Sequence, residues 1–306
     1  MPDTRNSPAR LDCPASASRL PALQECASAL LRVVTSGSGA TEEVALLVSR
    51  DPVLFLELLS VAPLDRDERA NPLKAIEQRI AQTDSGLLQA WFLRHSLPQP
   101  RQRNSHLSRR HLNLHSLLVA ELATHLARET AYPSPEDAYV TGLLHDLGQL
   151  WLAEHADDYL ELRASVGDER SLSAAEWERY GTDHSAISAQ LASHCGLSPS
   201  IADAITLHQA SPDELSTAHP LVRLTAAAEE LASYRSTQSA DSLSAASRLS
   251  GLDGSVLVSL LADVAPIIND AASDLGIVAE PAMLALPWSQ GPDKTTETAN
   301  EFTGIA

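Results

Sequence analysis

Hydrophobic positions along most of the chain recur with a helical period. The first such group shares one face of a predicted helix and consists of Leu20, Leu23, Ala27, Leu30 and Leu31. Gly37 and Gly39 follow it and would end the helix. The same period predicts helices near 41–49, 52–59, 72–81, 83–96, 107–130, 184–194, 199–208, 242–250 and 253–275. We find no alternating pattern of the kind that marks a strand. The pattern therefore predicts an all-α protein.

Several polar residues mark where these helices should begin. Asp51-Pro52, Ser134-Pro135 and Ser198-Pro199 each place a capping side chain before a proline that fits the first helical position. We expect Asp51 to act locally, so that Asp51→Ala costs about 1 kcal/mol. Ser173 with Glu176, and Ser211 with Glu214, have the spacing of a capping box. The charged stretch 65–71 and the polar stretch 236–241 are predicted as loops.

Composition shifts divide the chain into four parts. Residues 1–18 are rich in Pro, Ser and Ala and are predicted as a flexible lead-in, and 281–306 are predicted as a flexible tail. The proline- and arginine-bearing stretch 97–104 is the best candidate for a boundary. We therefore expect an N-terminal helical lobe over 19–100 and a second helical lobe over 101–280.

The charge balance excludes some partners. With 22 Lys and Arg against 40 Asp and Glu, the formal charge is −18, which disfavours nucleic acid and anionic membranes because both require a basic face. A local basic cluster remains, formed by Arg101, Arg103, Arg109 and Arg110; we interpret it as a solvated hinge or a partner contact. We find no membrane span and no secretory signal. The scattered Cys13, Cys26 and Cys195 suggest a reducing compartment, so we expect a cytoplasmic protein.

The histidines carry most of the chemical information. Nine of the eleven lie between 106 and 208, and the segment 142–150, GLLHDLGQL, places His145 beside Asp146 near a helix end that Gly148 would terminate. Imidazole with carboxylate suits a divalent cation. If His115, His184 and His208 converge on this pair, a buried cation site results. The spacing leaves a second interpretation open, a buried polar pair that joins two helices.

The remaining histidines are interpreted as structural. Most helix histidines are half-buried with one hydrogen bond, and we assign that role to His95, His106, His125, His155, His194 and His219. His111 stands four residues before His115, but no acid completes a metalloprotease-type motif, so we expect it to face solvent.

The order of these motifs resembles the HD superfamily, and within it the HDOD (HD-related output domain) group. The similarity is carried by EDAYVTGLLHDLGQL over 136–150, by Glu176, Tyr180-Gly181, His184 and Gln190-Leu191, and by ITLH ending at His208. The upstream stretches 44–62 and 71–93 resemble the family's N-terminal half. The resemblance implies a two-lobe helical fold with an HD-like C-terminal lobe, and a regulatory role in bacterial signal transduction.

The chain departs from active HD phosphohydrolases at three points. A late-helix aspartate is replaced by Ala226, Ala227 and Ala228, the usual lysine is Gln149, and Gln209 follows His208 with no Gly-Tyr-Pro after it. Asp146 is then the only carboxylate that the sequence places among the candidate ligands, and two divalent ions would be poorly compensated. An aspartate introduced at position 226, 227 or 228 should accordingly raise metal affinity.

Two functional hypotheses follow. In the first, the protein is a non-catalytic signalling module that relays a signal through a protein partner or a small ligand, and no residue is assigned a catalytic role. In the second, it is a metal-dependent phosphohydrolase or phosphodiesterase acting on a nucleotide or cyclic dinucleotide. The departures favour the first. We expect at most a single divalent metal ion, in a degenerate site of His115, His145, Asp146 and His208 with His184 at its rim; the sequence names no ligand-binding residues.

Overall fold

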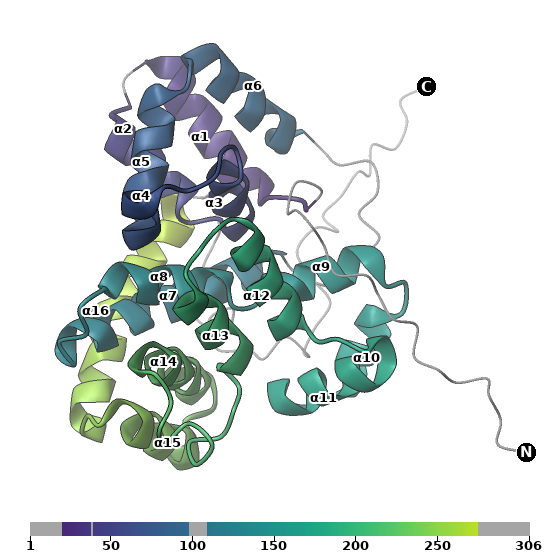
Figure 1. Cartoon of the computed structure of the whole chain (residues 1–306), viewed down its shortest axis with the longest axis vertical. Helices are drawn as coiled ribbons and strands as arrows, with labels where there is room; N and C mark the ends of the chain where they lie inside the picture. The colour runs from purple at the N-terminus through teal and green to yellow at the C-terminus, as the bar shows by residue number, and fades with distance from the viewer. Residues whose placement is uncertain (1–19, 38, 98–108, 275–306) are drawn as a thin grey trace, which may run out of the picture.

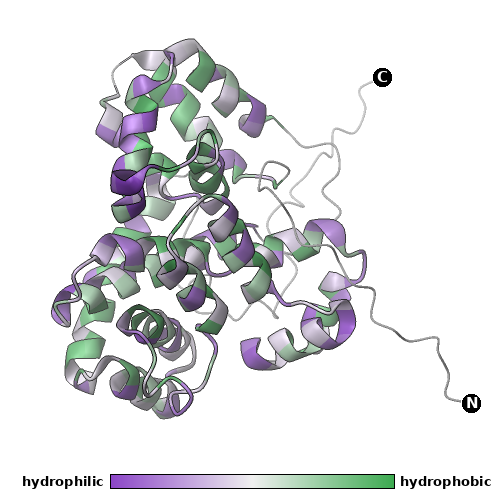
Figure 2. Cartoon of the chain, in the orientation of Figure 1, coloured by the Kyte–Doolittle hydropathy of each residue, from purple (hydrophilic) through white to green (hydrophobic). Residues whose placement is uncertain are grey.

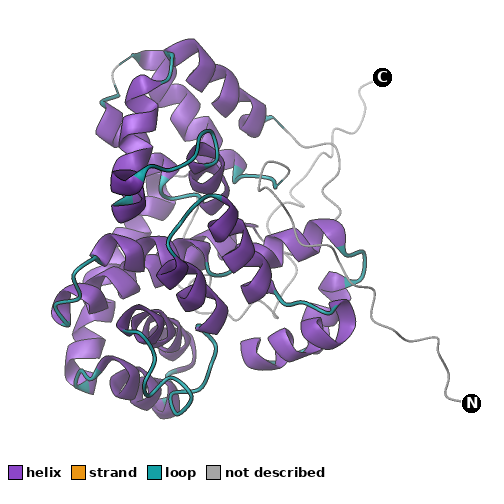
Figure 3. Ribbon diagram, viewed as in Figure 1, coloured by secondary structure: helices purple, strands orange, loops and turns teal. Residues whose placement is uncertain are grey.

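The computed structural model describes residues 20–37, 39–97 and 109–274, and every regular element in these ranges is a helix (Figure 3). The helices of the N-terminal lobe are α1 (Gln24–Ser36), α2 (Thr41–Val48), α3 (Pro52–Leu59), α4 (Arg66–Ala70), α5 (Pro72–Gln82) and α6 (Ser85–Ser96). The all-α prediction is confirmed. The predicted lead-in, the tail and nearly all of the 97–104 boundary lie outside the described residues, as do Arg101, Arg103 and His106.

The second lobe contains the remaining helices and lies below the first in Figure 1. They are α7 (Arg109–Glu129), α8 (Pro135–Leu144), α9 (Leu147–His155), α10 (Tyr159–Ser165), α11 (Glu169–Tyr180), α12 (His184–His194), α13 (Pro199–Leu207), α14 (Pro220–Thr237), α15 (Ala240–Ser250) and α16 (Gly254–Asp274). Most helices carry both hydrophilic and hydrophobic residues (Figure 2), and one continuous cluster of buried apolar side chains runs through both lobes.

The cap of α3 does more than the sequence indicates. One oxygen of Asp51, Oδ1, accepts from the backbone N–H groups of Val53 and Leu54 at 2.9 and 3.0 Å, as a capping residue should. The other oxygen, Oδ2, accepts from the N–H of Leu23 at 2.7 Å, and the side chain is almost completely buried. The expectation of a purely local role was therefore wrong, because Asp51 also ties the segment that leads into α1 to the start of α3.

Four other local predictions differ from the structure. The predicted 65–71 loop contains the short helix α4, which begins with a capping box between Asp65 and Glu68. Ser173 and Glu176 lie inside α11, whose cap is Asp168. Ser211 and Glu214 do bond reciprocally, but on a turn that no α-helix follows. The predicted 236–241 loop shrinks to two residues between α14 and α15.

The two lobes contact each other through specific polar groups as well as through the core. The hydroxyl of Tyr139, on α8, donates to the carbonyl oxygen of Ser49, just after α2, at 3.1 Å. Arg50 donates to Asp274 at the end of α16 over 2.7 Å, and Arg110 on α7 bonds to Glu25 on α1 at 2.7 Å. Part of the predicted basic cluster is thus engaged within the chain.

Helix α16 is long and apolar enough, by length and composition alone, to cross a membrane, although no span was predicted from the sequence. Its buried face, formed by Leu257, Leu260, Val264 and Ile268, packs within the protein. A core helix of a soluble protein passes the same test, so the helix by itself is weak evidence for a membrane.

Candidate metal site

Six polar side chains from five separate places in the second lobe meet at one point. His115 projects from the middle of α7, and His145 and Asp146 form the junction between α8 and α9. His184 is the first residue of α12, His208 directly follows α13, and Glu229 lies on α14. The structure therefore brings together all the candidate ligands named from sequence and adds a glutamate.

Distances around this point are short. The Nε2 atom of His145 lies 3.4 Å from Asp146 Oδ2 and 3.4 Å from Glu229 Oε2. His115 Nε2 is 3.3 Å from the same Glu229 oxygen and 3.8 Å from Asp146 Oδ2. His208 Nε2 is 3.8 Å from Asp146 Oδ1. Nitrogens and oxygens at these separations can all reach one ion placed between them.

Hydrogen bonds to the backbone fix which ring nitrogen points at this centre. His145 Nδ1 lies 2.7 Å from the carbonyl oxygen of Gly142, and His208 Nδ1 lies 2.7 Å from that of Ile205. A carbonyl oxygen can only accept, so Nδ1 carries a proton in each ring, and in the neutral ring Nε2 presents a lone pair. The buried atoms His145 Nε2, His208 Nε2 and Asp146 Oδ1 have no hydrogen-bond partner within the described residues, and Glu229 Oε2 is paired with His115 at 3.3 Å.

His184 lies at the edge of the cluster, outside the two groups of side chains whose ligand atoms all lie within 4.8 Å of one another. Its side chain has no exposed surface, and its Nε2 lies 3.5 Å from Asp146 Oδ1. The side-chain nitrogen of Gln209 stands 3.0 Å from the same Nε2. Gln209 thus competes for the lone pair that His184 would offer an ion.

The expectation that Asp146 is the only carboxylate at the site was wrong. Ala226, Ala227 and Ala228 are packed into the core at 0–2% exposure, and the next residue, Glu229, turns its carboxylate to the histidines. Its position four residues after the fully buried Thr225 puts it on the inner face of α14. An acid on a buried helix face was the sequence signal that could have identified it.

Comparison with known proteins identifies the same family that the sequence motifs resemble, over the larger part of the chain. The model of the HDOD domain matches residues 20–211. The chain belongs to the HDOD family. The match ends before α14, so Glu229 lies outside the matched residues.

Solved structures related to this HDOD protein share its fold. The MmoQ response regulator of Methylococcus capsulatus strain Bath is 25% identical with a TM-score of 0.65, covering 80% of this chain and 98% of its own. A virulence factor of Campylobacter jejuni is 18% identical with a TM-score of 0.52, covering 88% and 96%. No curated protein sequence matches the chain.

Gly148 serves close packing at the site, and its predicted role as a helix terminator was wrong. It lies inside α9, where its N–H donates to the hydroxyl of Ser188 at 2.7 Å. A Cβ atom at this position would stand 2.1 Å from the carbonyl oxygen of His184. The absence of a side chain lets α12 approach α9 closely enough to bring His184 to Asp146.

The electrostatics of the HDOD site follow from burying acids among imidazoles. Burial alone would lower the pKa of His115, but the carboxylates of Glu229 and Asp146 outweigh it and raise that pKa to about 9. Burial would raise the pKa of Asp146, yet the imidazoles, His145 foremost, lower it to about 2. Burial, reinforced by His145, lowers the pKa of His208 to about 4, so that imidazole stays neutral.

The residues present fit one divalent cation. Asp146 and Glu229 supply two negative charges, which match one doubly charged ion, and the neutral imidazoles supply lone pairs. His115, His145, Asp146, His208 and Glu229 would hold the ion, with His184 as a further ligand if Gln209 moves aside. The clusters of His115, His145 and Glu229, and of His145, Asp146 and His208, each keep their ligand atoms within 4.8 Å of one another.

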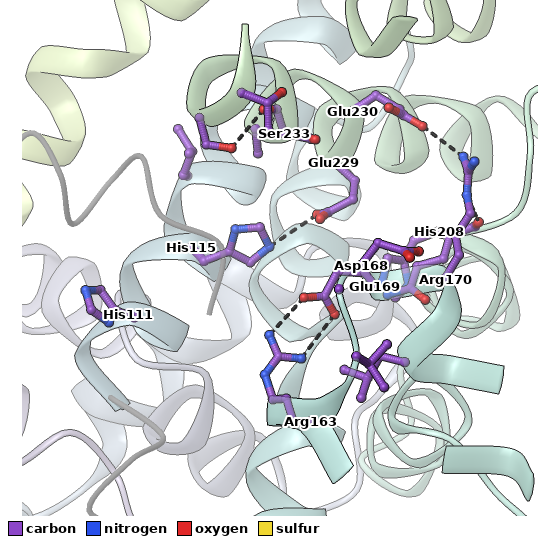
Figure 4. A pocket seen from close by; sticks show the side chains of 18 of the residues that line it. His111, His115, Arg163, Asp168, Glu169, Arg170, His208, Glu229, Glu230 and Ser233 are labelled. Atoms are coloured by element: carbon purple, nitrogen blue, oxygen red, sulfur yellow. Dashed lines mark hydrogen bonds and ion pairs between the residues drawn. The ribbon is translucent and has the colours of Figure 1, made fainter. Parts of the chain in front are cut away.

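A cavity of about 370 Å³ adjoins this centre, and Figure 4 shows side chains that line it. His115, His208 and Glu229 line it together with residues of α7, α14 and the α10–α11 segment. Leu114, Leu118, Val166, Leu172 and Ala232 give it an apolar wall, and Ser233, Ser236 and Thr237 line its far end. The volume and the mixture of apolar and polar groups are typical of a site for a small molecule.

Both arginines that line the cavity are held by acids. Arg163 donates to Glu169 through two nitrogens, at 2.8 and 3.3 Å, and Arg170 bonds to Glu230 at 2.9 Å (Figure 4). Gln149, at the position of the usual family lysine, is completely buried, with its side-chain nitrogen 3.4 Å from Glu169. The positive charge that could face an anion in the cavity is therefore largely neutralised by neighbouring carboxylates.

The remaining described histidines make contacts away from the site, and most of these are local. The Nδ1 atoms of His125, His155 and His194 each bond to a carbonyl oxygen four residues earlier. His95 bonds to Glu57, and His219 caps α14. His111 is half-buried and lines the cavity, so its predicted solvent-facing position was wrong.

Proposed function

We propose that this protein is a signal-transduction module of the HDOD family that binds one divalent cation in its second lobe and relays the state of that site to a protein partner, without hydrolysing phosphoesters. The observation that carries the proposal is the buried meeting of imidazoles with two carboxylates: His145 Nε2, His208 Nε2 and Asp146 Oδ1 have no hydrogen-bond partner within the described residues, and Glu229 Oε2 lies within 3.4 Å of both His115 and His145. Buried lone pairs and carboxylates that face one another are costly unless a cation lies between them. The similarity to a response regulator supports the signalling part.

The charge of the site favours one ion over two. Two divalent ions would bring four positive charges to two carboxylates, and histidines add no negative charge. A second ion also needs ligands of its own, while Asp146 and Glu229 already share His115 and His145, and Asp146 also faces His208. A two-metal phosphodiesterase centre is therefore disfavoured.

The cavity also disfavours phosphoester chemistry. Phosphoryl transfer needs cations that stabilise the charge on the equatorial oxygens. Here the guanidinium of Arg163 is engaged by Glu169, that of Arg170 by Glu230, and Gln149 carries no charge. Asp168, Glu169 and Glu230 add negative charge to the cavity lining, which repels a phosphate group.

One helix links the ion site to the other lobe. α8 ends directly before His145 and carries Tyr139, whose buried hydroxyl bonds to Ser49 in the N-terminal lobe. Helices move as rigid elements, so a shift of His145 and Asp146 on ion binding is transmitted to this contact. α8 is thus a direct mechanical route from the site to the N-terminal lobe, where a partner would detect the change.

Calorimetric titration of chelator-treated protein with Mn²⁺ tests the proposal. We expect one ion per chain, binding at least tenfold weaker in Glu229→Gln, and unchanged binding in the matched control Glu230→Gln. In the presence of Mn²⁺, Mg²⁺ or Fe²⁺, the protein should hydrolyse nucleotides, cyclic dinucleotides and simple phosphoesters no faster than buffer containing the same ion does. Turnover that disappears in His145→Ala would overturn the non-catalytic assignment and establish the phosphohydrolase alternative, and no Mn²⁺ uptake would overturn the ion site.

A further inference from the structure

Glu176 is a completely buried carboxylate whose two oxygens both have named donors. Its Oε2 accepts from the backbone N–H of His184 at 2.8 Å and lies 2.6 Å from Nδ1 of the same ring. Its Oε1 accepts from the hydroxyl of Tyr159 at 2.8 Å. Neither Glu176 nor His184 has exposed side-chain surface, and Tyr159 is equally buried.

Capping the start of α12 does not by itself account for the free-energy cost of burying the Glu176 carboxylate. Removing a carboxylate from water requires strong compensating interactions, and a buried ion pair is seldom a net source of stability. A neutral asparagine, serine or threonine could cap α12 equally well, and Asp183 already accepts from the N–H of Ala186 at 2.8 Å. The carboxylate of Glu176 is therefore placed for the imidazole ring.

The ring nitrogen bonded to Glu176 determines what the other nitrogen can do. With Nδ1 donating to the Glu176 carboxylate, Nε2 is the nitrogen that faces Asp146 Oδ1, 3.5 Å away, and it becomes available as a ligand when an ion displaces the proton from it. A carboxylate behind an imidazole also makes the opposite nitrogen a stronger electron donor. In the ion-free protein a proton on Nε2 compensates its approach to Asp146, and a bound divalent ion would take the place of that proton.

We infer that Glu176 is a positioning residue of the ion site, which fixes the orientation of the His184 ring and strengthens its Nε2 as a ligand. This inference rests on the proposed function, since it concerns the same ion. Tyr159 is the outer member of the chain and holds the Oε1 oxygen in place. The assignment also explains why the capping-box spacing of Ser173 and Glu176 is not used: the hydroxyl of Ser173 bonds to Asp183 and leaves Glu176 to His184.

The same contact ties the site to the α10–α11 segment, which forms one side of the cavity (Figure 4). Tyr159 begins α10 and Glu176 lies on α11, so both helices are connected to His184 through one carboxylate. Arg170, at the other end of α11, reaches Glu230 and the carbonyl oxygen of Gln209. Ordering of His184 by an ion should therefore also order this segment.

The test compares Glu176→Gln with Glu178→Gln, which removes an exposed charge two residues away on the same helix. Mn²⁺ affinity is measured by titration, and Co²⁺ is used as a second probe because its visible absorption reports the ligand geometry. We expect Glu176→Gln to bind Mn²⁺ about ten- to a hundredfold more weakly and to change the Co²⁺ spectrum. Glu178→Gln should match the wild type in both, and Tyr159→Phe should show a smaller loss of affinity.

The outcomes separate the two claims. If the wild type binds neither ion, the proposed function fails, and this inference fails with it. If the wild type binds both ions and Glu176→Gln binds them with unchanged affinity and spectrum, the positioning role alone is refuted. Should Glu176→Gln not fold, Tyr159→Phe decides: unchanged Mn²⁺ affinity and an unchanged Co²⁺ spectrum in that variant would overturn the inference.

Discussion

Gly148 and His184 stand so close that the space between α9 and α12 admits no side chain. A Cβ atom on Gly148 would lie 2.1 Å from the carbonyl oxygen of His184 and 2.8 Å from its Cα. Because the opposing atoms are backbone, a substitution has to move α12 as a unit. The site therefore depends on a residue that itself offers no ligand.

Gly148→Ala should consequently lose stability and ion affinity together. Overpacking costs about 1–3 kcal/mol, and the displacement carries His184 away from Asp146. Urea unfolding and Mn²⁺ titration measure the two effects. Gly254→Ala is the control, since a Cβ there would meet only Leu243 at an ordinary 3.5 Å. A Gly148→Ala variant with wild-type stability and affinity would contradict the packing at this point.

Ion affinity should increase with pH. In the ion-free protein the pKa of His115 is raised to about 9, mainly by Glu229 against the effect of burial, and that of His184 to about 9, mainly by Glu176. Both rings therefore hold protons at pH 7, and an ion must displace them. Mn²⁺ affinity should rise between pH 6 and 9 and level off above, with proton release at pH 7 detectable by calorimetry in buffers of different ionisation enthalpy.

The same shifts predict how the ion-free protein depends on pH. A histidine whose folded pKa is raised contributes stability that is complete below its unfolded pKa of about 6.5 and is lost as the pH rises through the folded value, here about 9. The ion-free wild type should thus melt at a lower temperature at pH 9 than at pH 6.5. The drop in melting temperature between these two pH values should be larger in the wild type than in Glu229→Gln. Thermal unfolding at both values checks this, and an equal loss in the two proteins would argue against the His115–Glu229 pair.

Asp51→Ala should cost more than an ordinary helix cap. The substitution removes the two capping bonds of α3 and leaves the N–H of Leu23 without its acceptor in a buried place. We expect about 2–3 kcal/mol, against about 1 kcal/mol for Asp84→Ala, which removes the exposed cap of α6. Chemical unfolding measures both, and Mn²⁺ affinity should be unchanged in each because both caps lie in the N-terminal lobe. Equal losses would mean that the bond to Leu23 contributes nothing.

The contact between Tyr139 and Ser49 should carry the proposed relay. If it does, Mn²⁺ binding alters hydrogen exchange in α2 and α3 of the wild type, and Tyr139→Phe reduces that change while the affinity for Mn²⁺ stays within a few fold. Hydrogen exchange with mass spectrometry resolves the two lobes. A full response of α2 and α3 in Tyr139→Phe would show that the signal takes another path.

Much of the fold is encoded locally, and those parts could be predicted from the sequence. Hydrophobic period and capping chemistry depend on residues within one or two turns, so the starts of α3 at Asp51-Pro52 and of α13 at Ser198-Pro199 match the predictions. The order of His145, Asp146, His184 and His208 was likewise sufficient to indicate a common site, because it resembles that of a known family.

What the sequence alone determined was most of the helices and most of the side chains that meet at the candidate site. What only the tertiary structure decided was which other polar groups join them. Glu229 comes from a helix 114 residues after His115 in the sequence, and Glu176 has a capping spacing but bonds to His184 instead. Gly148 was predicted to end a helix, but it lies inside α9 and allows the close approach of His184. Each of these outcomes depends on how closely two helices approach, and that distance is fixed by the burial of side chains throughout the lobe, which no local pattern records.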